Sequence, residues 1–336
     1  MKLIVQIPCY NEEDTIAQTI ADIPRNILGI DTVEVLIISD GCTDNTIEAA
    51  LAAGAEHTIS FKSNQGLARA FSAGLDACLS LGADIIVNTD ADNQYYGGDI
   101  PVLIAPILEG RADLVIGDRQ TQTIEHFSPL KKALQWLGSS VVRKLSGTKV
   151  QDTVSGFRAY SKEAAIKLNV LSNFSHTIET IIQASRRNLT IASVPIQTNP
   201  VLRESRLFKS IPHFIRNSLI TMVRVYAMYK PLRVFFFTGL FFFILGAIPI
   251  IRFLYFYFQG GGQGHVQSLL LGSMFVLIAV FAWLIGLVAD LMSFNRQLQE
   301  LTLERVKRLE LECLNKEQPT ASLVDQKINV DSHGTE

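Results

Sequence analysis

The chain has 336 residues, of which 48% are hydrophobic and 18% charged. With a mean hydropathy of +0.24, this composition is too apolar for an ordinary soluble enzyme, and the length allows one large domain or two smaller ones. The four cysteines form no CxxC pair and lack the spacing of a zinc site, so we expect reduced thiols. The formal net charge of −2 identifies no partner by itself, and we expect no nucleic-acid partner.

Short apolar runs alternate with helical patterns through the first 120 residues. The apolar runs cover 3–8, 33–39, 57–61, 83–89 and 112–118, and the helical patterns cover 12–23, 43–53, 67–81 and 100–108. Continuous apolar strands separated by such helices are typical of a parallel sheet that is covered on both faces. We therefore predict an α/β fold whose ligands bind at the carboxyl ends of the strands.

Polar sequences follow four of these runs. They are PCYNEE at 8–13, SDGCTDNT at 39–46, TDADNQ at 89–94 and GDRQ at 117–120. The carboxyl ends of parallel strands meet at one edge of a sheet, so these four loops together predict a binding site.

The third polar loop carries the pair Asp90 and Asp92. Residues two apart in a strand point the same way, so both carboxylates could be directed at one point just past the strand. Carboxylate and amide oxygens suit Mg²⁺ or Mn²⁺, and Mg²⁺ commonly shares its coordination sphere with substrate phosphates. A lone DxD sequence also occurs by chance on surface loops, and it is the position beside three other polar strand ends that favours a metal site.

Beyond Arg119 the alternation ends. We expect a helix near 131–145, a loop at 151–161, a helix near 176–187 and a short strand at 190–198. His176 and Glu179 fall one helical turn apart, and with no third ligand in view we expect a solvated or capping role for them. From 201 to 233 there are seven basic residues and one acid, which favours helices lying at an anionic membrane surface.

Two long segments carry no charge, Val234–Ile251 with 18 residues and Val266–Ala289 with 24. At about 1.5 Å per residue each can cross most or all of a hydrocarbon core roughly 30 Å thick. Neither has a polar face, so we predict two transmembrane helices rather than buried core helices, with Arg252 extending toward the head groups. The start of the chain shows no signal-peptide pattern, and Lys and Arg flank the spans but not the 259–265 connection. We therefore expect the first 200 residues and both termini in the cytoplasm.

After Asp290 the pattern is helical to about Leu314, with apolar residues at 291, 294, 298 and 301. This spacing leaves open a coiled coil or a single amphipathic helix, and a homo-oligomer is a reasonable expectation. From Asn315 the tail is polar and predicted to be disordered. The expected organisation is a cytosolic catalytic domain at 1–200, basic interface helices at 201–232, transmembrane helices at 233–258 and 266–290, and a cytosolic helix and tail at 291–336.

The motifs PCYNEE, SDGCTDNT, NTDADNQY, GDRQ and SGFRAYS, in this order and followed by two apolar spans, resemble those of a family 2 glycosyltransferase. More narrowly, the chain resembles the polyprenyl-phosphate glycosyltransferases, the group containing dolichyl-phosphate mannose synthase and the bactoprenol glucosyltransferases. The resemblance covers residues 1 to about 289 and implies a GT-A fold, which is a Rossmann-like, mostly parallel sheet. It implies inverting transfer of one sugar from a UDP- or GDP-sugar to a polyprenyl phosphate, assisted by Mg²⁺ or Mn²⁺.

The resemblance also implies roles for individual residues. The nucleotide-sugar pocket would be lined by Pro8, Tyr10, Glu12, Asp40 and Asp90, and the metal would be held by Asp90, Asp92 and Gln94. From charge and position, independently of the resemblance, we expect the catalytic residues to be Asp92, Arg119 and Arg158, and the acceptor phosphate to be held by Arg119, Arg158, Arg206 and Lys209. A guanidinium can bind a phosphate through two hydrogen bonds, which favours these roles. The alternative for Arg119 and Arg158 is that they are solvated surface residues. The alternative for Arg206 and Lys209 is that they are only attracted to anionic lipids.

The chain departs from the family pattern at Ser39, where many members have aspartate in an Asp-Asp-Gly-Ser sequence that here reads Ser39-Asp40-Gly41-Cys42. This puts the finer geometry of base recognition, and with it the donor preference, in question. The QxxRW motif of processive synthases is missing, since Gln135 is followed directly by Trp136. Two alternatives are a glycosyltransferase acting on another membrane lipid, such as a diacylglycerol, and a non-catalytic nucleotide-sugar-binding membrane subunit.

Overall fold

The computed structural model describes residues 1–120, 143, 150, 152–170, 176–200, 230–260 and 265–317. The chain divides into two compact units, Met1–Ile215 together with Glu304–Glu336, and Arg216–Leu303. The helix expected near 131–145, most of the interface helices expected at 201–232 and the tail beyond 317 lie outside the described residues.

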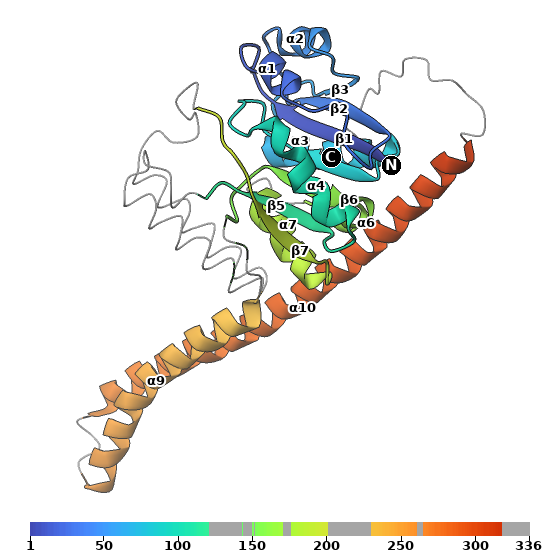
Figure 1. Cartoon of the computed structure of the whole chain (residues 1–336). Helices are drawn as coiled ribbons and strands as arrows, with labels where there is room; N and C mark the ends of the chain where they lie inside the picture. The colour runs from blue at the N-terminus through green and yellow to red at the C-terminus, as the bar shows by residue number, and fades with distance from the viewer. Residues whose placement is uncertain are drawn as a thin grey trace. The chain divides into compact units, whose positions relative to one another are not determined.

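The first unit is built on a seven-stranded sheet with the order β3-β2-β1-β4-β6-β5-β7 (Figure 1). Its strands are β1 (Lys2–Cys9), β2 (Thr32–Ser39), β3 (His57–Ser60), β4 (Ile85–Asn88), β5 (Leu114–Asp118), β6 (Arg158–Ser161) and β7 (Ile191–Pro195). Strand β6 pairs antiparallel with both of its neighbours, and the remaining neighbours pair in parallel. The predicted α/β fold with a mostly parallel sheet is confirmed.

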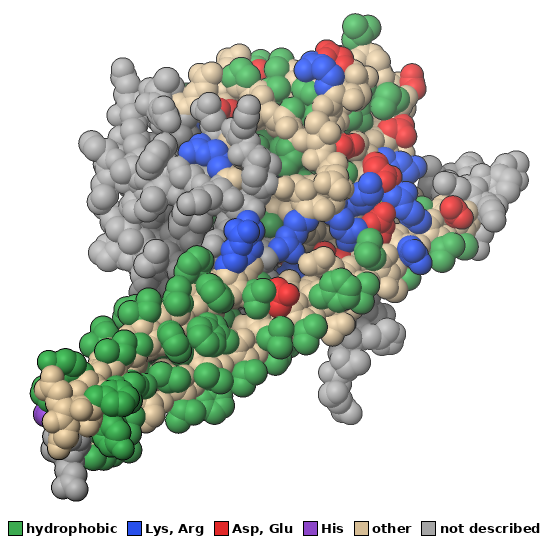
Figure 2. Space-filling model, turned by 90° about the horizontal axis from the view of Figure 1, so that it is seen from below, with side chains coloured by type: hydrophobic (Ala, Val, Ile, Leu, Met, Phe, Trp, Pro, Cys, Tyr) green, Lys and Arg blue, Asp and Glu red, His purple; other side chains and the backbone are tan. Residues whose placement is uncertain are grey.

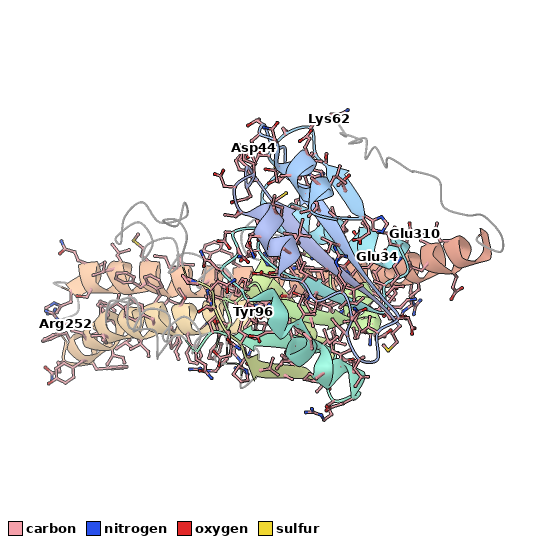
Figure 3. The ribbon with its side chains drawn as sticks, turned by 45° about the horizontal axis from the view of Figure 1, so that its top comes forward. Glu34, Asp44, Lys62, Tyr96, Arg252 and Glu310 are labelled. Atoms are coloured by element: carbon pink, nitrogen blue, oxygen red, sulfur yellow. The ribbon has the colours of Figure 1, made fainter. Side chains whose placement is uncertain are left out.

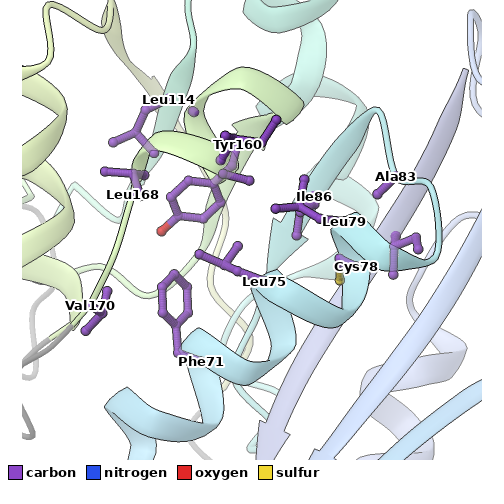
Figure 4. Close-up of a cluster of buried hydrophobic side chains, with 14 of the residues drawn as sticks. Phe71, Leu75, Cys78, Leu79, Ala83, Ile86, Leu114, Tyr160, Leu168 and Val170 are labelled. Carbon is purple, nitrogen blue, oxygen red and sulfur yellow. The ribbon is translucent and has the colours of Figure 1, made fainter. Parts of the chain in front are cut away.

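Alternating side chains of the strands enter two separate cores, one on each face of the sheet. From β1, Ile4 faces the core formed with α3 (Leu67–Ser80), α6 (Lys162–Lys167) and α7 (His176–Arg186), as Figure 4 shows for part of that cluster. Leu3 and Val5 face the other core, formed with α1 (Ile16–Ala21), α2 (Thr46–Ala52) and α4 (Ile100–Leu108), the last of which follows the short helix η1 (Gly97–Asp99). Burial on both faces explains why the strand sequences are continuously apolar.

Two expectations drawn from the sequence need correction. The segment expected as a loop at 151–161 contains strand β6, whose four residues are too few for a periodic pattern to be visible. Helix α2 begins at Thr46 rather than at Thr43, because Asp44 accepts the backbone N–H of Thr46 at 3.1 Å and holds the preceding residues in a turn.

The second unit contains helix α9 (Pro231–Phe258) and the first part of α10 (Val266–Glu317). Both helices are long and apolar enough to cross a membrane, with a mean hydropathy of 2.5 in their most apolar windows. Figure 2 shows hydrophobic side chains covering the surface of these helices. They approach closely where small residues face each other, since a Cβ atom at Gly246 would lie 2.7 Å from the Gly272 carbonyl oxygen.

Helix α10 continues without a break past the predicted end of the second span. Its last part, Glu304–Glu317, belongs to the first unit, and we call it the α10 end segment. Lys307 of this segment pairs with Asp76 of α3 at 2.7 Å, and Arg308 pairs with Glu163 of α6 at 2.6 Å. Leu311 packs against the core on the α3, α6 and α7 face, so the end segment is part of the surface of the first unit.

Candidate active site

Four strands end at one edge of the sheet, where the sequence predicted a site. β1, β2 and β4 run in parallel, and β5 has the same direction because antiparallel β6 lies between it and β4. The loops that follow carry the four polar motifs, and Figure 3 labels Asp44 after β2 and Tyr96 after β4. Because β6 runs the opposite way, the loop leading into it, residues 152–157, meets the same edge.

The acidic pair lies directly beyond β4. Burial raises the pKa of Asp90 to about 7, and the negative charge of Asp92 adds to the shift. The carboxylate of Asp90 packs against the chain at Gly156, where a Cβ atom would lie only 2.9 Å from Asp90 Oδ1. Asp92 accepts the backbone N–H of Gln94 at 3.2 Å, which fixes the short turn after the strand. Two close carboxylates that repel each other form a site where a cation would be stabilised.

Asn88, the last residue of β4, connects the acidic loop to the segment that precedes β6. It is buried, accepts a hydrogen bond from Gln6 Nε2 at 2.9 Å and donates one to the carbonyl oxygen of Gly156 at 2.8 Å. This network ties β1, β4 and the 152–157 loop together beneath the carboxylates. The side-chain amide of Asn88 is thereby satisfied on both sides, whereas Gln6 Oε1 is buried without a hydrogen-bond partner among the described residues.

Arg119, after β5, forms a two-point ion pair with Asp152. Its Nε and Nη2 atoms donate to the two carboxylate oxygens at 2.8 and 3.1 Å. Its guanidinium carbon lies 6.0 Å from the centroid of the Tyr95 ring, and its side chain keeps an exposed fraction of 20%. Arg119 is therefore oriented by a buried carboxylate while part of it faces the solvent, as a phosphate-binding residue requires.

The structure places Arg158 in the interior, not at an open surface. Its side chain is 0% exposed, and it donates to the backbone carbonyl oxygens of Ser155, Thr177 and Thr153 at 2.7, 2.7 and 2.9 Å. It also donates to Thr180 Oγ1 at 2.8 Å. This geometry does not support the predicted catalytic and acceptor-phosphate roles, because the guanidinium is used to connect the 152–157 loop to α7.

The residues predicted for the nucleotide pocket lie in the loops after β1 and β2. Pro8 is buried within β1, Tyr10 is 42% exposed just beyond it, and Glu12 is partly buried. Asp40 is buried, and its two carboxylate oxygens accept the backbone N–H groups of Gln65 and Gly66 at 2.6 and 2.9 Å. Asp40 therefore holds the loop before α3, in addition to any contact with a base.

The loop after β2 also packs closely against the loop before α3 at Gly41, which explains why this position has no side chain. Gly41 has φ of +73°, and a Cβ atom there would lie 2.6 Å from the carbonyl carbon of Ser63. The loop after β2 is also joined to the loop after β1, since Asn11 Oδ1 accepts the Thr43 N–H at 2.8 Å. Ser39, noted above as a departure from the family pattern, accepts the N–H of Cys42 through its Oγ at 3.2 Å.

His176 and Glu179 are buried rather than solvated, which corrects the expectation for this pair. The His176 ring stacks on Phe71 with centroids 4.5 Å apart, and burial lowers its pKa to about 3, so it is neutral. Glu179 accepts a hydrogen bond from Gln183 Nε2 at 3.2 Å. His176 is the first residue of α7 and Glu179 lies in its first turn, and both side chains are buried.

Sequence reasoning missed Asp152, Tyr95 and Gly156 as parts of the site. Asp152 lies in the segment expected as a loop at 151–161, three residues before the SGFRAYS motif that contains Arg158, so its proximity in sequence was the available signal. Tyr95 accepts the Gly156 N–H at 2.9 Å and stacks on Phe157. Arg206 and Lys209 lie outside the described residues.

Comparisons with known proteins identify the family of the chain. Residues 4–168 match the family described as Glycosyl transferase family 2. A UDP-N-acetylglucosamine–dolichyl-phosphate N-acetylglucosaminyltransferase of Methanococcus voltae is 32% identical over 216 residues, covering 57% of this chain and 83% of the relative. A dolichyl-phosphate hexose transferase of Haloferax volcanii is 32% identical over 205 residues, covering 61% and 86%. The chain belongs to glycosyltransferase family 2.

Within glycosyltransferase family 2, the similar proteins fall in the polyprenyl-phosphate group, as the sequence motifs indicated. An undecaprenyl-phosphate mannosyltransferase of Micrococcus luteus is 27% identical over 206 residues, covering 58% of this chain and 83% of the relative. A solved structure with the same fold is glucosyl-3-phosphoglycerate synthase from Mycobacterium tuberculosis in complex with Mn²⁺, UDP-glucose and phosphoglyceric acid. Its TM-score is 0.52 at 23% identity, covering 66% of this chain and 78% of that one, which confirms the GT-A fold.

Proposed function

We propose that this glycosyltransferase moves one sugar from a UDP- or GDP-sugar to a polyprenyl phosphate at the cytoplasmic membrane face, with inversion at the anomeric carbon. The observation that carries the proposal is the acidic pair Asp90 and Asp92 at the same sheet edge as the oriented cation of Arg119. Such a site suits a diphosphate and a second phosphate together. Three of the similar proteins named above are named as transferases of dolichyl or undecaprenyl phosphate, and the chain has two helices suited to a membrane.

The site fits a divalent cation, Mg²⁺ or Mn²⁺. Burial and the charge of Asp92 raise the pKa of Asp90, because the ionised carboxylate lacks enough compensating positive charge. A cation bound beside it would keep this carboxylate ionised. Asp90, Asp92 and Gln94 would hold the ion. When bound, it would supply positive charge that stabilises the departing nucleoside diphosphate. The related fold of glucosyl-3-phosphoglycerate synthase binds Mn²⁺ together with UDP-glucose.

The acceptor we propose explains why the described site needs no strong general base. A phosphate monoester has a second pKa of about 6, so it is largely a dianion at pH 7 and already a nucleophile. Arg119, held in place by Asp152, would position one phosphate, and the buried network of Asn88 and Arg158 would keep the surrounding loops rigid. Attack from the side opposite the diphosphate would convert an α-linked donor into a β-linked product.

Arg206 and Lys209 are proposed to bring the acceptor phosphate to the site from the membrane surface. We expect the Arg206→Gln, Lys209→Gln variant to lose about tenfold to a hundredfold in kcat/KM for the lipid, the range for one lost charge-assisted phosphate contact. KM for the nucleotide sugar should stay nearly constant. Kinetics in detergent without anionic lipid are the measurement, and unchanged lipid kinetics there would reduce both residues to membrane anchors.

The proposed function is tested by offering radiolabelled UDP- and GDP-sugars to membranes that contain the full chain and undecaprenyl phosphate. We expect one donor to give a lipid-extractable product that requires added Mg²⁺ or Mn²⁺ and polyprenyl phosphate. Transfer to diacylglycerol instead would change the acceptor in the proposal. Nucleotide-sugar binding with neither transfer nor hydrolysis in any combination would refute an enzymatic function.

A further inference from the structure

Residues 196–199, which follow β7, lie beside the loop that carries the acidic pair, and we call them the post-β7 segment. Thr198 forms an antiparallel bridge with Tyr95. The backbone N–H of Asn199 donates to the carbonyl oxygen of Gln94 at 2.9 Å. A stretch of chain that is distant in the sequence is therefore paired with the loop proposed to hold the metal.

The start of the post-β7 segment is anchored to the fold. Ile196 is 8% exposed and belongs to the core on the α1, α2 and α4 face. A Cβ atom at Gly117 would lie 2.8 Å from Ile196 Cδ1, so the glycine leaves room for this side chain. The N–H of Gln197 donates to the carboxylate of Asp99, and its carbonyl oxygen accepts the N–H of Tyr96 at 3.4 Å. The segment therefore has a fixed place beside the acidic loop.

The side chain of Asn199 reaches the same loop. Its Nδ2 donates to the backbone carbonyl oxygen of Asn93 at 3.1 Å and to Asn93 Oδ1 at 3.3 Å, and it lies 3.5 Å from Asp22 Oδ2. A backbone carbonyl and an ionised carboxylate can only accept hydrogen bonds, which fixes the orientation of the Asn199 amide. Asn199 thus holds two successive residues, Asn93 through its side chain and Gln94 through its backbone.

Asn93 has a backbone conformation that few residues adopt. It is 5% exposed, and its φ of +54° lies in the left-handed region, which asparagine tolerates better than most residues other than glycine. It stands between Asp92 and Gln94, two of the three residues proposed to hold the metal. Asp92 closes this turn from within by accepting the Gln94 N–H, and Asn199 holds it from outside.

The other side of the acidic loop is held by helix α1. The Oγ1 atoms of Thr15, the N-cap residue, and of Thr19 donate to the carbonyl oxygen of Ala91 at 2.8 and 3.1 Å. Ala91 lies between Asp90 and Asp92, so the backbone on both sides of Asp92 is fixed by other elements. A loop held in this way keeps two mutually repelling carboxylates together before a cation arrives, which lowers the cost of binding the ion.

We propose that Asn199 is a positioning residue for the divalent cation: by fixing the turn at Asn93 and Gln94, it keeps the proposed metal ligands in an arrangement that can share one ion. The proposal rests on the metal site of the proposed function and adds to it a residue from a distant part of the chain. Asn199 acts through the backbone of its neighbours and is not itself a ligand.

The variants separate the side chain of Asn199 from its backbone. Asn199→Ala removes the side-chain contacts but keeps the N–H that donates to Gln94, so the segment should stay paired with the loop. Asn199→Ser keeps one side-chain donor and is the milder second variant. The matched control is Gln197→Ala, because Gln197 is exposed and makes its contacts described above with its backbone. Asp92→Asn is the reference for lost metal binding.

The first measurement is the affinity for Mn²⁺, read from the electron paramagnetic resonance signal of the free ion. The full chain is used in detergent, with UDP or GDP present in separate samples. We expect Asn199→Ala to raise the Kd for Mn²⁺ about tenfold, the lower end of the range for residues that orient metal ligands. Asn199→Ser should fall between Asn199→Ala and the wild type, Gln197→Ala should match the wild type, and Asp92→Asn should bind most weakly.

The second measurement needs neither metal nor activity. Hydrogen exchange of the EDTA-treated chain is followed by mass spectrometry of peptides that cover 89–99. We expect these peptides to exchange about two- to tenfold faster in Asn199→Ala than in the wild type, as the loss of one or two hydrogen bonds allows. Peptides from β1 and β2 should be unchanged. In the transfer assay, kcat should return close to the wild-type value when Mn²⁺ is saturating.

The outcomes distinguish the inference from the proposed metal site. Equal Mn²⁺ affinity of Asn199→Ala and the wild type, in conditions where Asp92→Asn binds less, would overturn the inference and leave the metal site intact. Equal affinity of Asp92→Asn and the wild type would overturn both. Faster exchange across the whole sheet in Asn199→Ala would also overturn the inference, because Asn199 would then serve general stability. Weaker Mn²⁺ binding with faster exchange in the acidic loop alone supports it, even if no transfer is detected.

Discussion

At the scale of single residues, Asp92 contributes charge to the site and little packing. Replacing it by asparagine removes that charge with almost no change in volume, so we expect Asp92→Asn to lose most of its transfer activity while it stays folded and membrane-bound. Treatment of the wild type with EDTA should have the same effect. The measurement is the transfer assay together with the thermal unfolding temperature of the detergent-solubilised chain.

A matched control for this prediction is Asp14→Asn, which removes an equal charge from an exposed position in the loop after β1. It should retain transfer activity. Wild-type turnover in Asp92→Asn, or in the EDTA-treated chain, would contradict the metal assignment.

His176 gives the folded chain a predictable sensitivity to acid. Its pKa is about 3 in the folded state and about 6.5 when unfolded, so the unfolded state binds more protons between these values. Stability is therefore complete above pH 6.5 and falls by about 1 kcal/mol per pH unit as the pH drops below it. His176→Phe keeps the ring stacked on Phe71 but cannot take a proton.

Thermal unfolding of the full chain in detergent at pH 7.5 and 5.5 measures this effect. The wild type should lose more stability on acidification than His176→Phe, by about 1 kcal/mol, because all other groups titrate in both proteins. If both proteins lose the same amount, His176 is protonated in the folded state and the assigned burial is wrong.

At the scale of elements, the sequence could predict the strands that carry the acidic pair but not the strand that carries Arg158. The apolar run before Asp90 is long enough to identify a buried strand. Strand β4 ends at Asn88, however, and Asp92 lies in the turn that follows, so the expected alignment of the two carboxylates by a period of two does not apply. β6 has four residues and follows a polar stretch, so no periodicity marks it. The partners of Arg158 are mostly backbone carbonyls, which leave no trace in the side-chain sequence.

The α10 end segment is held on the catalytic unit by ion pairs, and these can be tested by charge exchange. Lys307 is 13% exposed and pairs with Asp76, which is 51% exposed. We expect Lys307→Asp to raise the hydrogen-exchange rate of the segment about two- to fivefold, in line with about 0.5–1 kcal/mol for a partly exposed pair. Exchange is read by mass spectrometry of peptides from this segment.

The reciprocal variant provides the control for the pair. Adding Asp76→Lys to Lys307→Asp should restore slow exchange, because it rebuilds the pair with opposite polarity. Arg305→Asp makes the same charge change on an exposed position of the same helix and should have a smaller effect. Equal effects of the two single variants would show that the contact with Asp76 does not hold the segment.

At the scale of the whole molecule, the proposed topology has two spans with both termini in the cytoplasm. We expect a single cysteine at position 259, at the end of α9, to react with an impermeant thiol reagent from the outside of intact cells. Cys313, retained as the single cysteine in a second variant, should react only after the membrane is opened. Labelling of both from the same side would contradict the two-span topology.

The overall plan was predictable from the sequence because hydrophobicity alone marks both the buried strands and the long apolar helices. The pairing of Arg119 with Asp152 was not predictable, because it joins residues far apart in the sequence across a segment without a periodic signal. The role of Ser39 likewise depends on a turn geometry that the sequence does not show. What escapes prediction is the set of long-range polar contacts that orient the site.

The ion pair between Arg119 and Asp152 also has a consequence for how this enzyme could change over generations. The pair joins Arg119 to Asp152, which are the two ends of the chain segment between them. Both ends lie at the edge of the sheet that carries the site, and Arg119 is near the Tyr95 ring. When the ends of a loop are held, doubling its length costs only about 0.6 kcal/mol of closure entropy. With its two ends joined at one place, the chain between Arg119 and Asp152 can therefore change in length at little cost in closure entropy and without displacing Arg119.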